Sequence, residues 1–262
     1  MPTKSSVLIT GASTGIGATY ADRFAKRGHD LVLVARDLTR METLADRLRK
    51  QAGVQVDILR ADLTDAQDLS LVEARLRDDH QIAVLVNNAG TAIAGGFVEH
   101  SADDIAMVVN LNAMALVRLA HAVAPRLVKK GMGSIINIGS VVGLAPEYGS
   151  AVYGATKAFV LFLSQGLQIE LGPKGIYVQA VLPAATRTEI WKHIGKDVNS
   201  VQVIMEVDEL VDAALAGFDR RETVTIPSLP NVDQWNDFDV ARKVMMSNCG
   251  QVHAAERYRK TV

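Results

Sequence analysis

The chain has 262 residues, of which 48% are hydrophobic and 22% charged, and its formal net charge is -1. These values exclude a disordered chain, a collagen-like repeat and a disulfide-rich scaffold. Because 28 basic residues stand against 29 acidic ones, we expect no nucleic-acid partner and no attraction to an anionic membrane. A single cysteine, Cys249, cannot form an internal disulfide, and no Cys/His cluster has ligand spacing. We therefore expect no bound metal and a reducing, cytoplasmic setting.

The sequence predicts neither an export signal nor a membrane span. The first apolar run, residues 7–9, ends at Thr10-Gly11 and is too short for the core of a signal peptide. The most apolar later stretch, residues 107–128, contains Arg118 and Arg126. Charges at bilayer depth are costly, so we expect this stretch to be a buried helix.

Short β-branched runs alternate with longer segments of helical period along the chain. The candidate strands are residues 7–9, 31–34, 54–59, 84–86, 135–138, 178–182 and, at a sheet edge, 223–227. The candidate helices are residues 15–28, 38–52, 65–79, 102–130, 152–172 and 207–219. Most of the strands are apolar on both faces, which is typical of parallel strands covered by helices. We predict an α/β fold with a doubly wound, mostly parallel, Rossmann-type sheet. It would form a single domain over residues 1–262, with an insertion near 187–222 and a C-terminal tail.

A glycine-rich segment, residues 10–17 (TGASTGIG), follows the first candidate strand and opens the first candidate helix. A dinucleotide-binding turn requires this context, because the unpaired N–H groups of the helix N-terminus then face the anion. Gly11 would permit the tight turn, Gly15 would let the backbone approach a pyrophosphate, and Gly17 would let the helix lie close to the sheet. The spacing is G-x3-G-x-G rather than G-x-G-x-x-G, so a plain strand-to-helix turn stays an alternative.

The end of the second candidate strand is where an acidic residue would hydrogen-bond the ribose 2′-OH of NAD. This sequence has Ala35 there, followed by Arg36. A guanidinium binds a 2′-phosphate through charge-assisted hydrogen bonds, so the pair favours NADP over NAD. Arg40, one helical turn on, is a second candidate contact. The alternative is that Arg36 is a solvated surface residue, or that Asp37 pairs with a neighbouring base.

Tyr153 and Lys157 are four residues apart in a segment of helical period, so their side chains lie on one face of the helix. A free tyrosine, with a pKa of about 10, is a poor base at neutral pH, but a nearby ammonium favours the phenolate. Tyr153 could then exchange a proton with a substrate oxygen. The same spacing is common on exposed helices, so the pair alone decides little.

Taken together and in order, the motifs resemble those of the short-chain dehydrogenase/reductase family, in its short single-domain branch. They are TGxxxGxG at residues 10–17, NNAG at 87–90 and YxxxK at 153–157. Ser140 stands thirteen positions before Tyr153, where the catalytic serine of the family is found. Asn110, within the sequence VVNL, matches the catalytic asparagine, and Asp62-Leu63 matches the pair that faces the adenine.

The resemblance implies an NADP(H)-dependent oxidoreductase that moves a hydride between nicotinamide and a carbonyl or secondary alcohol. Tyr153 would be the acid/base and Ser140 would bind the substrate oxygen. Lys157 would hold the nicotinamide ribose and lower the pKa of Tyr153, while Asn110 would position a water that links Lys157 to solvent. The implied cofactor-binding residues are Gly11, Ser13, Thr14, Gly15, Ile16, Gly17, Arg36, Asp62, Leu63, Asn87, Ala89, Gly90, Tyr153, Lys157, Pro183, Thr186 and Thr188.

One position departs from the family pattern. After the sixth strand the family usually has Pro-Gly, whereas this chain has Pro183-Ala184. If the backbone there needed a positive φ, the alanine would be strained by roughly 1 kcal/mol or more. We expect a small shift in cofactor geometry at this point.

The residues expected near the substrate are mostly apolar: Ile93, Ala94, Val141, Val142, Leu144, Pro146, Tyr148, and a covering segment that begins at 188–194. A pocket so lined has few groups to pair with a carboxylate or phosphate, so we expect uncharged hydrophobic ketones, aldehydes or alcohols as substrates. Lys192 or Glu147 would overturn this if their side chains pointed into the pocket.

Residues 159–163 (FVLFL) are apolar all round their helix, and the fourth helix is similarly apolar, so both should also pack against a second subunit. The resemblance implies the same homodimer, often doubled to a homotetramer. Two alternatives to a carbonyl reductase remain. One is a non-catalytic NADP-binding regulator, which would not need Ser140, Tyr153 and Lys157 together. The other is an epimerase or dehydratase on the same scaffold, whose members usually carry a longer substrate domain.

Overall fold

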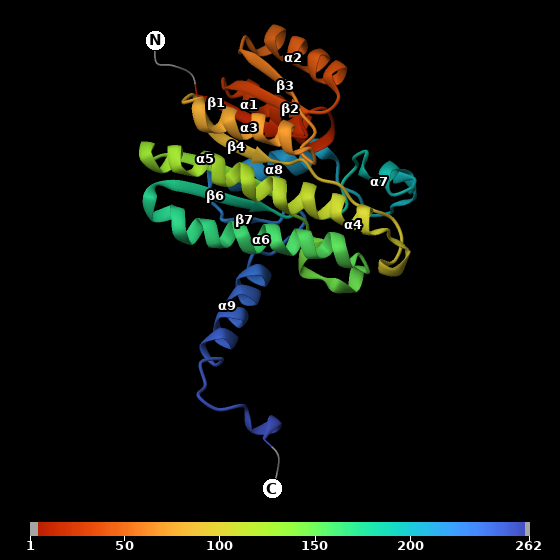
Figure 1. The fold of residues 1–262 in the computed structure, drawn as a ribbon, viewed down its shortest axis with the longest axis vertical. Helices are drawn as coiled ribbons and strands as arrows, with labels where there is room; N and C mark the ends of the chain where they lie inside the picture. The colour runs from red at the N-terminus through yellow and green to blue at the C-terminus, as the bar shows by residue number, and fades with distance from the viewer. Residues whose placement is uncertain (1–4, 260–262) are drawn as a thin grey trace. The chain divides into compact units, whose positions relative to one another are not determined.

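The computed structural model describes residues 5–259 and divides at Pro227 into two compact units. The first unit contains one sheet of seven parallel strands (Figure 1). The strands are β1 (Ser6–Thr10), β2 (Asp30–Ala35), β3 (Val56–Arg60), β4 (Ile82–Asn87), β5 (Gly133–Ile138), β6 (Ile176–Val181) and β7 (Val224–Thr225). Their order is β3-β2-β1-β4-β5-β6-β7, so the direction of winding reverses between β1 and β4. The predicted doubly wound, Rossmann-type α/β fold is confirmed.

Helices connect successive strands and cover the sheet. They are α1 (Gly15–Lys26), α2 (Leu38–Ala52), α3 (Ala66–Asp78), α4 (Ala102–Val109), α5 (Leu116–Lys130), α6 (Ala151–Leu171), α7 (Ile190–His193) and α8 (Val207–Asp219). A π-helical segment, η2 (Asn110–Ala115), joins α4 to α5, so these form the one long helix that the sequence predicts. Asp37 and Asp65 cap the starts of α2 and α3 by accepting backbone N–H bonds, which sets where these helices begin.

The sheet is buried on both faces. Alternate residues of each strand point to opposite sides, so Val7 and Ile9 of β1 enter one hydrophobic core and Leu8 enters the other. The first core is completed by α1, α2 and α8, and the second by α3, α5 and α6. Figure 1 looks onto the second of these faces, with α5 and α6 in front. This double covering explains why the strands are apolar throughout.

The helical segment Ala102–Lys130 is long and apolar enough to cross a membrane when judged by length and composition alone. In the structure, 44% of its most apolar window is buried inside the protein. Leu119 and Val123 lie in the second core, while Arg126 donates to the carbonyl oxygens of Leu76 and Ile82. The segment therefore packs as a core helix, as predicted.

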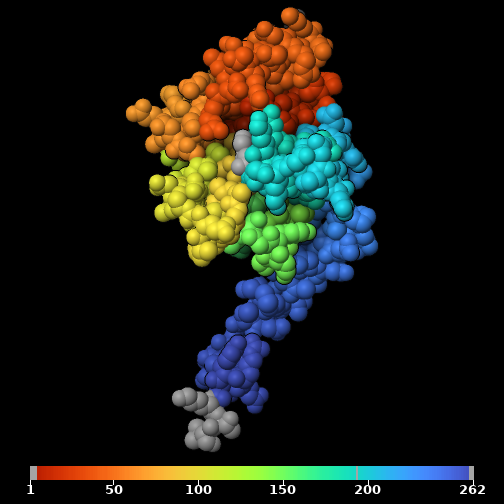
Figure 2. Space-filling view, turned by 90° about the vertical axis from the view of Figure 1, so that its right-hand side faces the viewer, coloured from red at the N-terminus to blue at the C-terminus, as the bar shows by residue number. Residues whose placement is uncertain are grey.

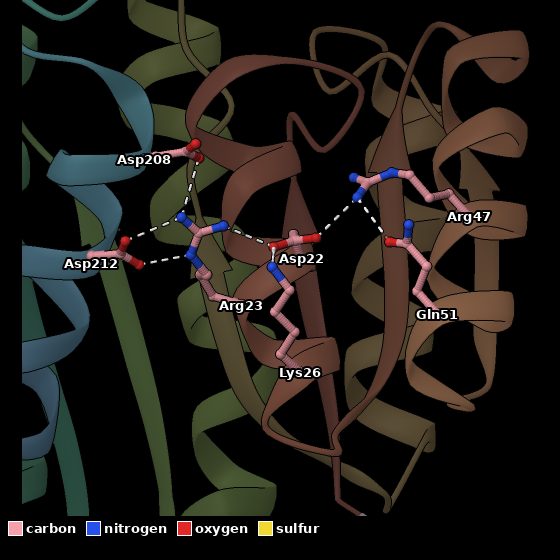
Figure 3. Close-up of polar contacts among 7 residues, drawn as sticks. All are labelled: Asp22, Arg23, Lys26, Arg47, Gln51, Asp208 and Asp212. Atoms are coloured by element: carbon pink, nitrogen blue, oxygen red, sulfur yellow. Dashed lines mark hydrogen bonds and ion pairs between the residues drawn. The ribbon is translucent and has the colours of Figure 1, made fainter.

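Asp22 of α1 is the centre of an ion-pair network that joins three helices (Figure 3). Its carboxylate lies 2.8 Å from Arg23, 2.7 Å from Lys26 and 3.0 Å from Arg47 of α2. Arg23 also contacts Asp212 of α8 at 2.7 Å. Burial alone would raise the pKa of Asp22, but hydrogen bonds from the three basic side chains lower it below its usual range. The network fixes α2 and α8 to α1.

The second unit runs from Ser228 and contains α9 (Asp233–Ser247) and the short segment η7 (Glu256–Tyr258). The sequence predicts only a tail here. Trp235 and Phe238 of α9 stack at 5.5 Å between ring centroids, and Asp239 pairs with Lys243 at 2.6 Å. The helix has no buried residue. It therefore lacks the buried apolar stripe by which sequence periodicity recognises a helix.

Candidate active site

The predicted site residues gather at one edge of the sheet. The glycine-rich turn follows β1, the segment 87–90 closes β4, Ser140 follows β5 and Pro183 follows β6. These four strands are neighbours in the sheet, and all are parallel, so their carboxyl ends meet. Ligands of open α/β sheets bind at this edge, beside the point where the winding reverses.

The glycine-rich turn has the close approaches that the sequence predicts. Gly11 and Gly15 adopt left-handed backbone, with φ of 64° and 52°. A Cβ on Gly11 would lie 2.8 Å from Asn88 Nδ2, and one on Gly17 would overlap the carbonyl oxygen of Gly11. The first turn of α1 therefore packs directly against the glycine-rich loop, and a side chain at Gly11 or Gly17 would prevent this close packing.

Asn88 and Thr10 hold this turn against the end of β4. Asn88 Nδ2 donates to the carbonyl oxygens of Thr10 at 2.9 Å and Gly11 at 3.1 Å. The Thr10 hydroxyl accepts from the N–H groups of Asn88 and Ala89, both at 3.0 Å. The sequence motif contains Asn88, but our site prediction omitted it. Its role is to position the backbone that faces a ligand.

The side chain of Asn87 points the other way. It is buried and donates to Asn137 Oδ1 at 3.0 Å and to the Leu116 carbonyl at 3.3 Å. Leu63 is likewise buried in the second core. For both residues, the predicted cofactor contact could involve only the backbone.

Ser140, Tyr153 and Lys157 come together as predicted. The Ser140 hydroxyl accepts from the Val142 N–H at 3.2 Å and donates to the Pro183 carbonyl at 3.3 Å. Lys157 Nζ donates to the Ile138 carbonyl at 2.9 Å and lies 5.6 Å from the centroid of the Tyr153 ring. Only 6% of Lys157 is exposed. An ammonium and a phenol thus share a buried position beside a serine hydroxyl.

Burial determines the electrostatics of this group. It lowers the pKa of Lys157 to about 8, because a buried ammonium loses its hydration. Burial also raises the pKa of Tyr153, and hydrogen bonding with Ser140 offsets only part of that rise. The expected lowering of the tyrosine pKa by Lys157 is thus not what the structure shows, because the net direction of the Tyr153 shift is upward. Lys157 keeps its charge at neutral pH and loses it in mildly alkaline solution.

The structure does not place Asn110 beside the group of Ser140, Tyr153 and Lys157 as the sequence analysis expects. Asn110 is exposed at the start of η2, whereas Asn112 is only 1% exposed. Asn112 Nδ2 donates to the Thr91 carbonyl at 2.8 Å and to Thr156 Oγ1 at 3.1 Å, and its Oδ1 accepts from the Thr91 N–H at 2.8 Å. A Cβ built on Gly90 would lie 3.2 Å from Asn112 Oδ1 and 3.5 Å from Lys157 Nζ. The asparagine beside the lysine is therefore Asn112.

Helical periodicity could have distinguished the two asparagines. Residues two apart lie on nearly opposite faces of a helix. Asn112 shares the buried face with Val108, Ala115 and Leu119, while Asn110 adjoins the exposed Val109.

The presumed 2′-phosphate position carries two exposed arginines. Arg36 is 73% exposed, and its Nη1 lies 3.6 Å from Asp62 Oδ2. Burial would raise the pKa of Asp62, but hydrogen bonds from Thr64 and the charge of Arg36 lower it overall. Arg40 contacts Asp37 at 3.3 Å and Glu189 at 2.8 Å. The suggested pairing of Asp37 with a neighbouring base thus occurs with Arg40, and Arg36 has no direct bond of normal length to Asp62.

Residues 187–200, which we call the flap, lie opposite the glycine-rich turn. Figure 2 shows this cyan segment against the red and orange N-terminal part of the chain. Between them is a hollow of about 630 Å³, lined by Thr14 and Gly15 on one side and by Thr188, Lys192 and others on the other. Of the two side chains that could have overturned the apolar pocket, Lys192 thus faces the glycine-rich turn and Glu147 is exposed.

Thr186 anchors the start of the flap. Its carbonyl accepts from Trp191 Nε1 at 2.7 Å, and its buried hydroxyl donates to the Ala184 carbonyl at 2.9 Å. Arg221 is the single non-glycine residue of positive φ among residues 5–259. Ala184 therefore has an ordinary backbone conformation, and the strain considered for the departure from Pro-Gly does not arise.

Comparison with known families decides what kind of protein this is. Residues 5–199, more than half of the chain, match the family model described as short chain dehydrogenase. The chain belongs to the short-chain dehydrogenase family. The motif-based prediction of this family is thereby confirmed, and the chain is an oxidoreductase of the class that its sequence resembles.

Solved structures of the family match almost the whole chain. A short-chain dehydrogenase from Sphingobium yanoikuyae, in complex with NADPH, is 64% identical, with a TM-score of 0.96 over 97% of this chain and 100% of that chain. A bulky-bulky ketone specific alcohol dehydrogenase from Comamonas testosteroni is 58% identical, with a TM-score of 0.92 over 98% of this chain and 99% of that one. A sulfoacetaldehyde reductase of Chromohalobacter salexigens is 38% identical over 70% of this chain and 73% of its own length.

Proposed function

We propose that this short-chain dehydrogenase uses NADP(H) to interconvert bulky, uncharged ketones and the matching secondary alcohols. The observation that carries the proposal is the group of buried Ser140 and Lys157 with half-buried Tyr153 beside the glycine-rich turn. A regulator that only bound the cofactor would have no use for a buried proton donor with an ammonium next to it. The same group argues for proton transfer to a substrate oxygen.

The fit of a dinucleotide rests on this chain's own backbone. Glycines stand at the tight turn and at the start of α1, and alanine at Gly11 or Gly17 would collide with neighbouring backbone or with Asn88. The residue that ends β2 is Ala35 rather than an acid, and Arg36, which is 73% exposed, can meet a phosphate. The NADPH bound by the Sphingobium yanoikuyae relative agrees with this choice.

The residues divide the chemistry between them. When bound, NADP(H) supplies or accepts the hydride at its nicotinamide ring. Ser140 would donate a hydrogen bond to the substrate carbonyl oxygen while Tyr153 transfers its phenolic proton to the same oxygen. Lys157, charged below its pKa of about 8, stabilises the phenolate that remains. Asn112, whose Oδ1 lies near Lys157, takes the positioning role that the sequence analysis gave to Asn110.

The substrate class follows from the residues around Ser140. Val141, Val142 and Leu144 are half-buried in the short segment that starts directly after it, and Tyr148 is exposed nearby in sequence. Apolar side chains of this kind remove water from a hydrocarbon or aromatic group and leave a charged group unpaired. The relative specific for bulky-bulky ketones supports the same class. The small anionic substrate named for the sulfoacetaldehyde reductase is the competing possibility.

A screen of NADPH oxidation separates these possibilities. The panel should hold matched neutral, anionic and cationic carbonyl compounds, such as an aryl alkyl ketone with and without a sulfonate. We expect the highest kcat/KM for a bulky neutral ketone. A preference for the sulfonated compound would refute the proposed substrate class, and Tyr153→Phe serves as the control for reaction at the proposed group.

We further propose a homodimer or homotetramer in a reducing, cytoplasmic setting. Support for a second subunit comes from large apolar side chains left exposed on α6 and the preceding long helix: Val109, Met114, Phe159, Phe162 and Ile169. Val160 and Leu161, between two of them, are buried, so this stretch is apolar on both sides. Light scattering at micromolar concentration tests the assembly, and a monomer would contradict it.

A further inference from the structure

An ion pair links the flap to the helix that carries the predicted phosphate-binding arginines. Arg40 Nη1 lies 2.8 Å from Glu189 Oε2, although the two residues are 149 positions apart. Arg40 is in the first turn of α2, and Glu189 immediately precedes α7 in the flap. The two side chains are 48% and 50% exposed, so solvent and ligands reach the pair.

The Arg40–Glu189 pair lies beside the glycine-rich turn, where the dinucleotide is proposed to bind. Arg40 and Ser13 line one hollow of about 290 Å³, and Glu189 lines the larger hollow together with Thr14 and Gly15. The two hollows are thus lined by successive residues of the glycine-rich turn, and the Arg40–Glu189 bond joins a lining residue of one to a lining residue of the other. In Figure 2 the cyan flap lies directly against the red and orange segments at this point.

A 2′-phosphate that contacted Arg40 would meet a cation that a carboxylate already holds. A phosphate monoester carries about -1.5 to -2 charges at neutral pH and binds arginine through paired hydrogen bonds. Glu189 offers one negative charge to the same guanidinium and repels a phosphate beside it. Arg36, 3.6 Å from Asp62, is held less closely than Arg40. A phosphate would therefore displace a closer carboxylate from Arg40 than from Arg36.

We propose that Glu189 and the 2′-phosphate of NADP(H) are alternative partners of Arg40. Binding of the phosphorylated cofactor takes the guanidinium from Glu189 and frees the start of α7. A cofactor without the phosphate leaves the ion pair in place. Glu189 is therefore a specificity-determining residue that ties the flap to the identity of the cofactor. This inference rests on the proposed use of NADP(H).

Two ligands isolate the phosphate from the chemistry. 2′-Phospho-ADP-ribose and ADP-ribose differ only in the 2′-phosphate, and neither contains nicotinamide. Their affinities should be measured by calorimetry for the wild-type chain and for Glu189→Gln, Arg40→Gln and the double variant. Glu206→Gln is the matched control. Glu206 pairs with Arg187 of the flap at 2.7 Å, and this substitution removes the same charge as Glu189→Gln.

We expect Glu189→Gln to tighten 2′-phospho-ADP-ribose about fivefold and to leave ADP-ribose unchanged. In the Arg40→Gln background the same substitution should alter neither affinity, and Glu206→Gln should alter neither in the wild-type background. The non-additivity of the double variant measures the competition directly.

The fluorescence of Trp191 reports the conformation of the flap. Trp191 lies two residues after Glu189, and its Nε1 donates to the Thr186 carbonyl at the start of the flap. In a Trp235→Phe chain, 2′-phospho-ADP-ribose should shift the emission of Trp191, and ADP-ribose should not. Glu189→Gln should show the shifted emission without ligand.

Three results would overturn the inference, and they differ in what they leave standing. Equal weakening of both ligands by Glu189→Gln would mean that the pair closes over the cofactor rather than competing with it. A wild-type preference for the phosphorylated ligand that Glu189→Gln does not change would overturn the inference and leave the proposed NADP(H) dependence intact. No preference in either chain would overturn both.

Discussion

The proposed catalytic group (Ser140, Tyr153 and Lys157) and the proposed phosphate-binding pair (Arg36 and Arg40) differ in how far their charges are exposed. Lys157 is almost completely buried, and its ammonium contacts a carbonyl oxygen and faces a phenol. Arg36 and Arg40 are exposed and rest on carboxylates that a ligand could replace. Burial shifts the pKa values of Lys157 and Tyr153, which suits the proposed proton transfer, while exposure lets a ligand reach the arginines, which suits recognition.

The comparison also separates rigid from movable parts. Ser140 is bonded to a backbone group of the segment after β5, Lys157 to one of β5 itself, and Asn112 to one of the segment after β4. The flap is tied down by exposed ion pairs such as Arg187 with Glu206. Exposed pairs contribute little to stability, so breaking them would cost the fold little.

The largest effect should come from the buried side. Tyr153→Phe removes only the transferable proton, so we expect turnover to fall by a factor on the order of 10² or more. The fold and the cofactor affinity should stay unchanged. Steady-state kinetics together with an NADPH titration measure both. Turnover near the wild-type value would shift the role of acid/base away from Tyr153.

A substitution in the Asp22 network tests whether the stability of the fold depends on a buried charge outside the candidate active site. Asp22→Asn removes the carboxylate that Lys26 and Arg47 pair with and leaves Arg23 paired only with α8, so we expect the free energy of unfolding at pH 7 to fall by about 2 kcal/mol. Because folding lowers the pKa of Asp22, its stabilisation is complete above the unfolded value of about 3.9. The stabilisation is lost as the pH falls through the folded pKa.

Urea unfolding at pH 7 and near pH 3 measures this dependence for Asp22→Asn and for the wild type. The difference between the two chains should shrink at the lower pH. A constant difference would mean that the carboxylate charge is not what Asp22 contributes.

A matched pair of asparagines tests the corrected assignment. Asn112→Ala removes three hydrogen bonds in a buried position, and we expect about tenfold lower turnover with a lower melting temperature. Asn110→Ala changes an exposed residue and should leave both close to wild type. Asn112→Asp, which keeps the acceptor oxygen, separates the effect on Lys157 from lost stability through the pH profile of kcat. The reverse pattern between the two alanine variants would restore Asn110.

Much of the fold was predictable because the information is local. Each strand and helix of the first unit is a contiguous run, and the glycine-rich turn and the Tyr153–Lys157 pair lie within single elements. Ser140 lies in another element, and it was predicted to join them only because its position before Tyr153 resembles that of the family's serine.

The failures have a different origin. The choice between Asn110 and Asn112 depends on which face of a π-helical segment packs inward. Helix α9 has no buried face to mark it, and the contact between Arg40 and Glu189 joins residues that only the folded chain brings together. In each case the deciding fact is packing between distant segments.

The most direct test of the account is a crossed measurement on one buried and one exposed residue. Turnover at saturating NADPH and the dissociation constants of NADPH and NADH should be measured for Tyr153→Phe and Arg36→Ala side by side. We predict that Tyr153→Phe loses turnover and keeps both dissociation constants. Arg36→Ala should bind NADPH about tenfold more weakly, bind NADH as before and keep its turnover. Two results for Arg36→Ala would contradict this account: a loss of turnover at saturating NADPH, or an equal loss of affinity for NADPH and NADH. Either would mean that the proposed proton-transfer group and the proposed phosphate-binding arginines do not have separate roles.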